Sequence, residues 1–299
     1  TKTCMDMQLD THSLFVPNLK AALMEGRLAD AITQEIGSWK DDGRKKKARA
    51  ALSMLQGFDG DMIADSKEAA LVSAFLDQAT KNIFLDEMGT QRSDTWKAFL
   101  VMNNQSYNAT CDHLLMRNDE SPFWDDIHTP GKETKVQIMA RSLADAVTFM
   151  ESTLGSDATK WKWGALHTYT WETDTSKMAR NMGFVKRTAL NAFWSYFNRG
   201  PHPAPGDHFT LNVSAYTIGN DFNTWLIPSM RMIVDFSLEE PMVAGTSSGQ
   251  SDNPSNPHYD DGIKAWRDGS YIPFPFKEEA VEAHYKEIMI LQPSSTSRP

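Results

Sequence analysis

Apolar residues recur at helical spacings through the first half of the chain. This pattern predicts a helical segment over residues 5–23 and helices over residues 28–39, 45–55, 66–85, 96–102, 111–116 and 133–154. Asp65 or Ser66 is a natural N-cap for one helix, and Gly155 stands at the C-cap position of the last. Residues 1–160 are therefore predicted to form a helical region.

The second half of the chain changes to alternating and aromatic patterns. Apolar and polar residues alternate over 209–215 and 230–236, which predicts two strands, and a short helix is expected over 277–286. The segment 161–169 is aromatic and compact, 190–197 is apolar, and 198–207 holds too many prolines for regular structure. We expect residues 161–299 to form an α+β region with a frayed tail at 293–299.

Together the two regions predict an α+β fold that is predominantly helical in its N-terminal half, with a few antiparallel strands in its C-terminal half. The 299 residues carry a net charge of −9, which argues against a nucleic-acid partner or a cationic membrane binder. No apolar run approaches the roughly 20 residues that a membrane span needs. Two cysteines, Cys4 and Cys111, exclude a disulfide-dense scaffold, and their pairing stays open.

The segment G-T-S-S-G-Q-S-D-N-P-S-N-P-H-Y-D-D-G, residues 245–262, brings Ser, His and Asp together in the sequence. A Ser–His–Asp site needs convergence in space, and no G-x-S-x-G elbow is present. Asp260 and Asp261 follow His258 so closely that the usual orienting geometry is not expected. We predict instead that these polar groups bond the backbone and lock a long loop.

The histidines show no metal-binding spacing such as H-x-x-x-H or H-E-x-x-H. Asp59, Asp61 and Asp65 have some likeness to a calcium loop. However, the twelfth position counted from Asp59 is Ala70 rather than Glu. The sequence therefore predicts a capped turn here and no metal site.

Two further groups of residues could carry chemistry. Glu133, Asp145 and the pair Asp125-Asp126 could form paired carboxylates, although Glu133 is equally explained by the positive end of a helix. Thr1 could act as an N-terminal nucleophile with its own amine as the base, but a helical pattern follows it where a strand is needed. No Gly-rich phosphate loop precedes a helix, so nucleotide binding has no support.

An ordered set of motifs resembles the C-terminal part of the β-subunit in the penicillin acylase family, which includes penicillin amidases and acyl-homoserine-lactone acylases. The motifs are residues 7–14 (M-Q-L-D-T-H-S-L), 55–66, 121–126 with 133–134, 161–167 (W-K-W-G-A-L-H), 197–214, 249–261 and 266–269 (W-R-D-G). The chain departs from the pattern with Phe58 for Trp, Pro205 for Gly, Asp252 for Gly and Gly262 for Gln.

The resemblance implies a portion of an αββα Ntn-hydrolase fold. Members are cut from a precursor, and the β-chain N-terminal Ser attacks the amide with an oxyanion hole stabilising the intermediate. In the family these groups and the calcium ligands lie upstream, so no catalytic residue, metal ligand or cofactor is assigned to this chain. The implied partners are the remaining α/β-subunit segments and a small acyl-amide substrate, in the periplasm or outside the cell.

Under this interpretation the chain is an amidase fragment, inactive alone, whose loop braces the catalytic half. The candidate support residues are Gly249, Gln250, Ser251, His258, Tyr259, Asp260 and Asp261. Two alternatives stay open: an autonomous hydrolase that uses Thr1 or the His258 loop, and a non-catalytic helical binding domain.

Overall fold

The structure is a computed structural model, and it describes residues 2–105, 110, 111, 113, 119–173, 196–287 and 289–292. Its contacts divide the chain into two compact units, which are described separately. The larger unit is Leu9–Pro228, and the smaller one combines Thr1–Gln8 with Ser229–Pro299. Thr1, most of the predicted helix 111–116, most of the apolar segment 190–197 and the tail 293–299 lie outside the described residues.

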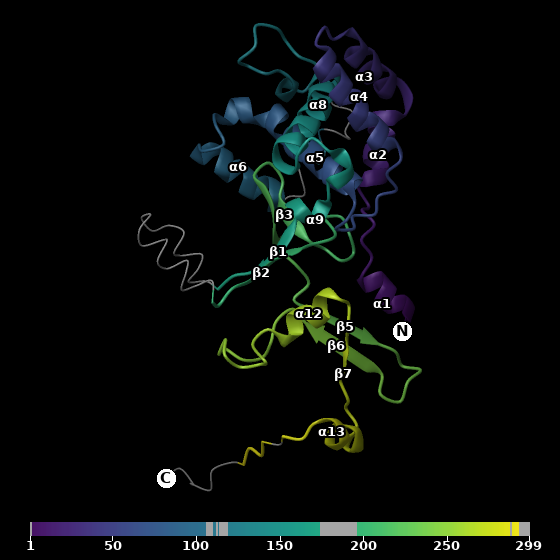
Figure 1. Ribbon diagram of the computed structural model, residues 1–299, viewed down its shortest axis with the longest axis vertical. Helices are drawn as coiled ribbons and strands as arrows, with labels where there is room; N and C mark the ends of the chain where they lie inside the picture. The colour runs from purple at the N-terminus through teal and green to yellow at the C-terminus, as the bar shows by residue number, and fades with distance from the viewer. Residues whose placement is uncertain are drawn as a thin grey trace. The chain divides into compact units, whose positions relative to one another are not determined.

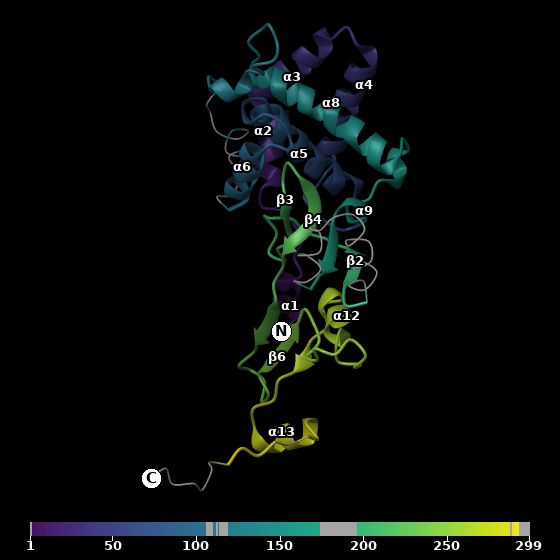
Figure 2. The same cartoon turned by 90° about the vertical axis from the view of Figure 1, so that its left-hand side faces the viewer.

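Helices dominate the larger unit, as the apolar periodicity predicts. They are α2 (Val16–Met24), α3 (Gly26–Ser38), α4 (Asp42–Gln56), α5 (Lys67–Met88), α6 (Asp94–Gln105), α8 (Lys135–Leu154) and the short α9 (Trp163–Leu166), with 3-10 turns η1 (Pro122–Trp124) and η2 (Ala158–Lys160). The long helix α8 packs across α3, α4 and α5 (Figure 1, Figure 2). Their apolar faces meet in one core cluster that buries most of α5.

Side-chain caps explain where the two longest helices begin. Ser66 accepts a hydrogen bond from the backbone N–H of Ala69 at the start of α5, at 3.0 Å. Thr134 and Gln137 form a reciprocal capping box at the start of α8. Because α5 is buried on nearly all sides, it serves as the central element on which the other helices pack.

The predicted helical segment 5–23 is interrupted. The structure has α1 (Lys2–Gln8) in the smaller unit and α2 in the larger one. Between them, the N–H of Ser13 donates to the carbonyl of Gly60, and the N–H of Met62 donates to the carbonyl of Thr11. These bonds hold the connecting backbone extended against the turn at Gly60, so the helix cannot run through.

The larger unit also holds a four-stranded sheet in the order β2-β1-β4-β3. The strands are β1 (Thr168–Trp171), β2 (Arg199–Pro203), β3 (Ala215–Thr217) and β4 (Asp221–Leu226). The core cluster continues onto this sheet through Tyr216 and Phe222. The helices and this sheet therefore share one core, and the boundary between the two compact units does not fall at residue 160, where the sequence patterns change.

Two sequence expectations about this sheet were wrong. Residues 198–207 contain strand β2 despite their prolines, because β2 is an edge strand of the described sheet and an edge tolerates Pro. Residues 209–212 form a turn and bends, and 213–214 are irregular, where a strand was expected. The carboxylate of Asp207 accepts from the N–H of Phe209 at 2.6 Å, and the hydroxyl of Thr210 donates to the carbonyl of Asn212 at 2.9 Å, which curls the backbone.

The smaller unit contains α1, a three-stranded sheet in the order β5-β6-β7, and two short helices. The strands are β5 (Met230–Val234), β6 (Met242–Thr246) and β7 (Ile272–Pro273), and the helices are α12 (Asp261–Arg267) and α13 (Glu278–His284). The predicted strand at 230–236 and the short helix at 277–286 are confirmed, and α12 is an addition. The fold is thus α+β, with all its described strands after residue 167.

Two findings bear on the environment of the chain. No helix in the described ranges combines the length and apolarity needed to cross a lipid bilayer. Cys4 in the smaller unit is exposed, Cys111 in the larger unit is buried, and both are free thiols in the structure.

Candidate functional site

Residues 245–262, here named the support loop, close on themselves through backbone hydrogen bonds. The carbonyl of His258 accepts from the N–H groups of Gln250 and Ser251, at 2.8 and 3.0 Å. The N–H of Gly249 donates to the carbonyl of Tyr259 at 3.2 Å. The two arms of the loop are therefore tied together beside the start of α12.

Two glycines make this closure possible. A Cβ at Gly249 would overlap the carbonyl oxygen of His258, and a Cβ at Gly262 would overlap the carbonyl oxygen of Ser248. Both obstacles are backbone atoms, so a side chain could be accommodated only by moving the loop. Only glycine allows the two arms to approach this closely.

Short polar side chains shape the tip of the loop. The hydroxyl of Ser251 accepts from the N–H of Asn253, Asn253 accepts from Ser255, and Asn256 accepts from the N–H of His258, at 2.8–3.2 Å. Such local side-chain bonds replace regular backbone pairing. The predicted side-chain bonds to the backbone are thus present, and they join residues of the loop to one another.

One sequence argument about His258 was wrong. Its Nδ1 lies 2.7 Å from a carboxylate oxygen of Asp261, so a separation of three residues is sufficient for the orienting contact. The first turn of α12 brings this carboxylate back beside the ring. In the described part of the chain, no hydroxyl bonds the other ring nitrogen of His258. Asp260 lies between them as the N-cap residue of α12, with no capping bond from its side chain.

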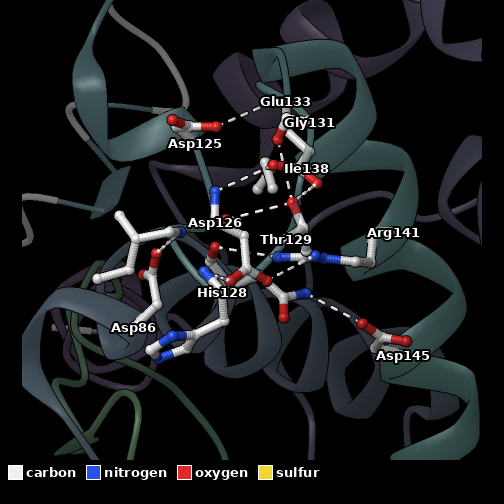
Figure 3. A network of polar contacts seen from close by, with 12 residues as sticks. Asp86, Asp125, Asp126, His128, Thr129, Gly131, Glu133, Ile138, Arg141 and Asp145 are labelled. Atoms are coloured by element: carbon white, nitrogen blue, oxygen red, sulfur yellow. Dashed lines mark hydrogen bonds and ion pairs between the residues drawn. The ribbon is translucent and has the colours of Figure 1, made fainter.

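The carboxylates near α8 form a structural network (Figure 3). Asp126 accepts from the guanidinium of Arg141 at 3.1 Å, and Glu133 accepts from the N–H of Asp126 and from the hydroxyl of Thr129. The N–H of Glu133 in turn donates to Asp125 at 3.1 Å. Burial acts to raise the pKa of Glu133, but the hydrogen bonds it accepts outweigh burial and lower this pKa.

The same network reaches the neighbouring helices. Asp145 on α8 accepts from Asn82 on α5 at 3.0 Å and from Arg44 on α4 at 3.2 Å. Asp86 accepts from the N–H of Ile127 at 2.8 Å (Figure 3). Because each carboxylate has a backbone or cationic partner, these groups pin the loop before α8. They do not form the paired carboxylates that the sequence allows.

Glu87 is a perturbed acid that the sequence analysis did not single out. Burial, a side-chain hydrogen bond with Asp86 and the charges of Asp86 and Asp125 together raise the pKa of Glu87 to about 7. The sequence feature that could have indicated this raised pKa is the pair of adjacent acids, Asp86 and Glu87, near the end of α5. Like charges in proximity favour the protonated form.

A buried polar cluster lies where the sheet of the larger unit meets α9. The Nδ1–H of His167 donates to the carbonyl of Phe222 at 2.6 Å, and its Nε2 accepts from the hydroxyl of Ser214 at 2.9 Å. The ring stacks on Trp163 with centroids 4.4 Å apart. Burial lowers the pKa of His167 to about 4. This serine–histidine pair is neutral and fully buried, so a substrate cannot reach it.

Asp207 belongs to the same cluster. It accepts from the hydroxyl of Ser13 at 2.8 Å, yet burial raises its pKa to about 6. The indole N–H of Trp163 donates to the carbonyl of Gly206 at 2.9 Å. The motifs 161–167 and 197–214, which are far apart in the sequence, therefore build one structural centre.

The acidic turn at residues 59–65 is a capped turn. Asp59 accepts from the N–H of Asp61, Asp61 accepts from the hydroxyl of Thr11 at 2.5 Å, and Asp65 pairs with Lys162 at 2.7 Å. Across the residues that the structure describes, no group of three or more His, Cys, Asp or Glu side chains could hold a metal ion.

Comparison with known proteins assigns the family. The family model described as penicillin amidase matches residues 1–283 of this chain. The chain belongs to the penicillin amidase family.

Among the relatives, the acyl-homoserine lactone acylase QuiP of Pseudomonas aeruginosa is 50% identical over 285 residues, which is 95% of this chain and 33% of that protein. The protein of the same name from Pseudomonas syringae pv. syringae is 41% identical, over 98% of this chain and 34% of its own length. The chain thus spans about a third of the curated relatives that it matches.

A solved structure is also similar. The thermostable penicillin G acylase from Alcaligenes faecalis matches 96% of this chain and 48% of its own chain, with 14% sequence identity and a TM-score of 0.44.

Proposed function

We propose that this chain is part of an amide hydrolase that removes the acyl group from an N-acyl substrate, and that the attacking nucleophile lies outside these 299 residues. The observation that carries the proposal is the 50% identity over 285 residues with a protein named an acyl-homoserine lactone acylase. The first substrate to test is therefore an N-acyl-homoserine lactone.

The geometry of the described residues supports a nucleophile outside this chain. Ser214 with His167 is sealed from solvent, and the exposed pair His258–Asp261 has no hydroxyl on its free ring nitrogen. A nucleophile must stand within hydrogen-bonding reach of its base and be open to the substrate. Neither described pair meets both conditions.

In the proposed reaction the nucleophile's hydroxyl oxygen bonds to the amide carbonyl carbon and its proton passes to a base. The C–N bond then breaks, and the amine leaves with that proton. Water hydrolyses the resulting ester and releases the acid. The support loop contributes indirectly, by holding the part of the molecule that carries the nucleophile.

The test is a chimera in which these 299 residues replace the matching segment of the Pseudomonas aeruginosa acylase. We expect it to release a primary amine from an N-acyl-homoserine lactone, measured by mass spectrometry, whereas the 299-residue chain alone releases none. Amine release by the isolated chain would refute the external nucleophile. A folded, processed chimera without amine release would refute the contribution to an acylase.

We also propose partners and a location by family resemblance. The partners are the other subunit segments of the same precursor, and the location is the periplasm or the exterior of the cell. The family's calcium ligands are expected outside this chain. Fractionation of cells that express the complete protein checks the location, and recovery only in the cytoplasm contradicts it.

A further inference from the structure

A cavity opens on the larger unit where three helices meet. Helix α2 ends at Met24 and α3 begins at Gly26, so a single extended residue, Glu25, turns the chain between them. Helix α4 packs against both and forms the third wall (Figure 1). The cavity has a volume of about 290 Å³. Ligand pockets in proteins measure about 300–1,000 Å³, so this cavity suits a small molecule.

Interactions outside the cavity hold its walls in place. The ammonium group of Lys20 on α2 donates to the carbonyls of Gln56 and Phe58, at 3.2 and 2.6 Å, at the C-terminal end of α4. Arg44 and Lys47 of α4 pair with carboxylates of α8 at 3.2 and 2.9 Å. Because α4 is tied both to α2 and to the long helix α8, the cavity is already formed before any ligand arrives.

Arg49 differs from the basic residues that precede it on α4. It follows Lys47 by two residues, which places it on the opposite side of the helix from the contact with α8. There it lines the cavity. Leu52, Ser53 and Gln56 continue the same stripe, at the spacing of one helix face. Arg49 forms no ion pair with any residue that the structure describes.

The wall formed by α3 carries the opposite charge. This helix supplies Ala29, Asp30 and Thr33 to the cavity. Asp30 also has no ion pair among the described residues, although Arg49 lines the same cavity. The carboxylate and the guanidinium therefore stand on different walls with space between them. Axes of packed helices lie about 8–10 Å apart, so two such groups can bind opposite ends of one small molecule.

The part of the cavity between these charges is apolar. Leu23 and Ala29 are buried, and Met24 and Leu52 are half-buried. An alkyl group that lies against these side chains is removed from water, which favours binding. The cavity thus combines one negative group, one positive group and an apolar surface.

We propose that this cavity binds a free α-amino acid with an apolar side chain. The ammonium group of the ligand pairs with Asp30, its carboxylate pairs with Arg49, and its side chain lies on Leu23 and Leu52. A simple carboxylate leaves Asp30 without a partner, and a simple amine leaves Arg49 without one, so the two walls select a ligand that carries both charges. The proposal goes beyond amide hydrolysis, because the ligand is bound and not converted.

Isothermal titration calorimetry tests the proposal on the complete protein that contains these 299 residues. Three probes share one alkyl group: L-leucine carries both charges, 4-methylpentanoate only the carboxylate, and isopentylamine only the ammonium group. Leucine should bind with a dissociation constant of about 1 mM or lower. Each analogue with a single charge should bind more than about tenfold more weakly, because it leaves one charged wall unpaired.

Two substitutions test the walls separately. Asp30→Asn and Arg49→Gln should each weaken the binding of leucine more than about tenfold. Arg27→Gln is the matched control, because Arg27 is an exposed arginine of α3 that does not line the cavity, and it should leave the affinity unchanged. The three replaced side chains are exposed, and circular dichroism checks that each variant is folded.

Three results would overturn the proposal. They are the absence of leucine binding in the millimolar range, equal affinity for leucine and 4-methylpentanoate, and equal affinity of Arg49→Gln and Arg27→Gln for leucine. Failure of the proposed function is a separate result, since the complete protein would then bind leucine through Asp30 and Arg49 and release no amine from an N-acyl-homoserine lactone.

Discussion

Acidification should destabilise the chain through two histidines, the buried His167 and the half-buried His208. Burial lowers the pKa of His167 and of His208 to about 4, from 6.5 in the unfolded chain. Between these values the unfolded chain binds the proton and the folded chain does not. Stability from each neutral ring is therefore fully present above pH 6.5 and is lost as the pH falls toward 4.

The size of the effect follows from these pKa values. Between pH 7 and pH 5, each histidine should cost about 2 kcal/mol of unfolding free energy. Asp207 acts in the opposite direction, since its pKa is raised to about 6 and the folded chain takes up its proton first. Protonation of Asp207 should therefore increase the free energy of unfolding by about 1 kcal/mol between pH 7 and pH 5.

Urea unfolding, monitored by tryptophan fluorescence at pH 7 and pH 5, measures how much stability each chain loses on acidification. Comparing the unsubstituted chain with His167→Gln isolates the contribution of His167 to that loss. The unsubstituted chain should lose about 2 kcal/mol more than this variant on acidification. The exposed residue His128 supplies the control, and His128→Gln should keep the full loss. Equal losses for the unsubstituted chain and His167→Gln would refute the assignment of a buried neutral imidazole.

Further predictions concern the loop, a helix cap and an acid. Gly249→Ala should cost about 2 kcal/mol in urea unfolding, whereas Gly37→Ala, where nothing lies within 4 Å, should not destabilise; equal effects contradict the crowded closure. Thr134→Ala should lower the free energy of unfolding by about 1 kcal/mol through loss of the cap at the start of α8. An unchanged free energy of unfolding would show that this cap does not stabilise the fold. Glu87→Gln should raise Tm at pH 8 and not at pH 5, because the raised pKa penalises the charged form only at high pH; a gain at pH 5 contradicts this. His258→Ala in the complete enzyme should lower Tm, with turnover falling only as a consequence of that lost stability. An unchanged Tm with lost activity would favour a catalytic role.

Local periodicity was sufficient to predict the long helices. The helix at 133–154 was found within two residues of α8 because its apolar spacing and its terminal glycine are both local signals. The strands were harder, because β1, β4, β6 and β7 are two to six residues long and depend on partners distant in the sequence. Alternation over 209–215 failed because turn bonds from Asp207 and Thr210 outweigh it.

The motifs of the candidate site were visible in the sequence, but their contacts were not. Distances such as His258 to Asp261 depend on the turn of α12, which the pattern did not predict. The burial of His167 with Ser214 likewise requires two segments separated by 47 residues to meet. Sequence order thus identified the family, whereas the chemical environment of each group required the fold.

The prolines of β2 have a consequence for the behaviour of the chain in concentrated solution. The N–H of Ala204 points inward to the carbonyl of His167, so alternation directs the backbone positions of Pro201 and Pro203 outward. Neither can donate to an incoming strand. This margin of the sheet is therefore a poor template for fibril growth, and precipitation of the protein should begin elsewhere.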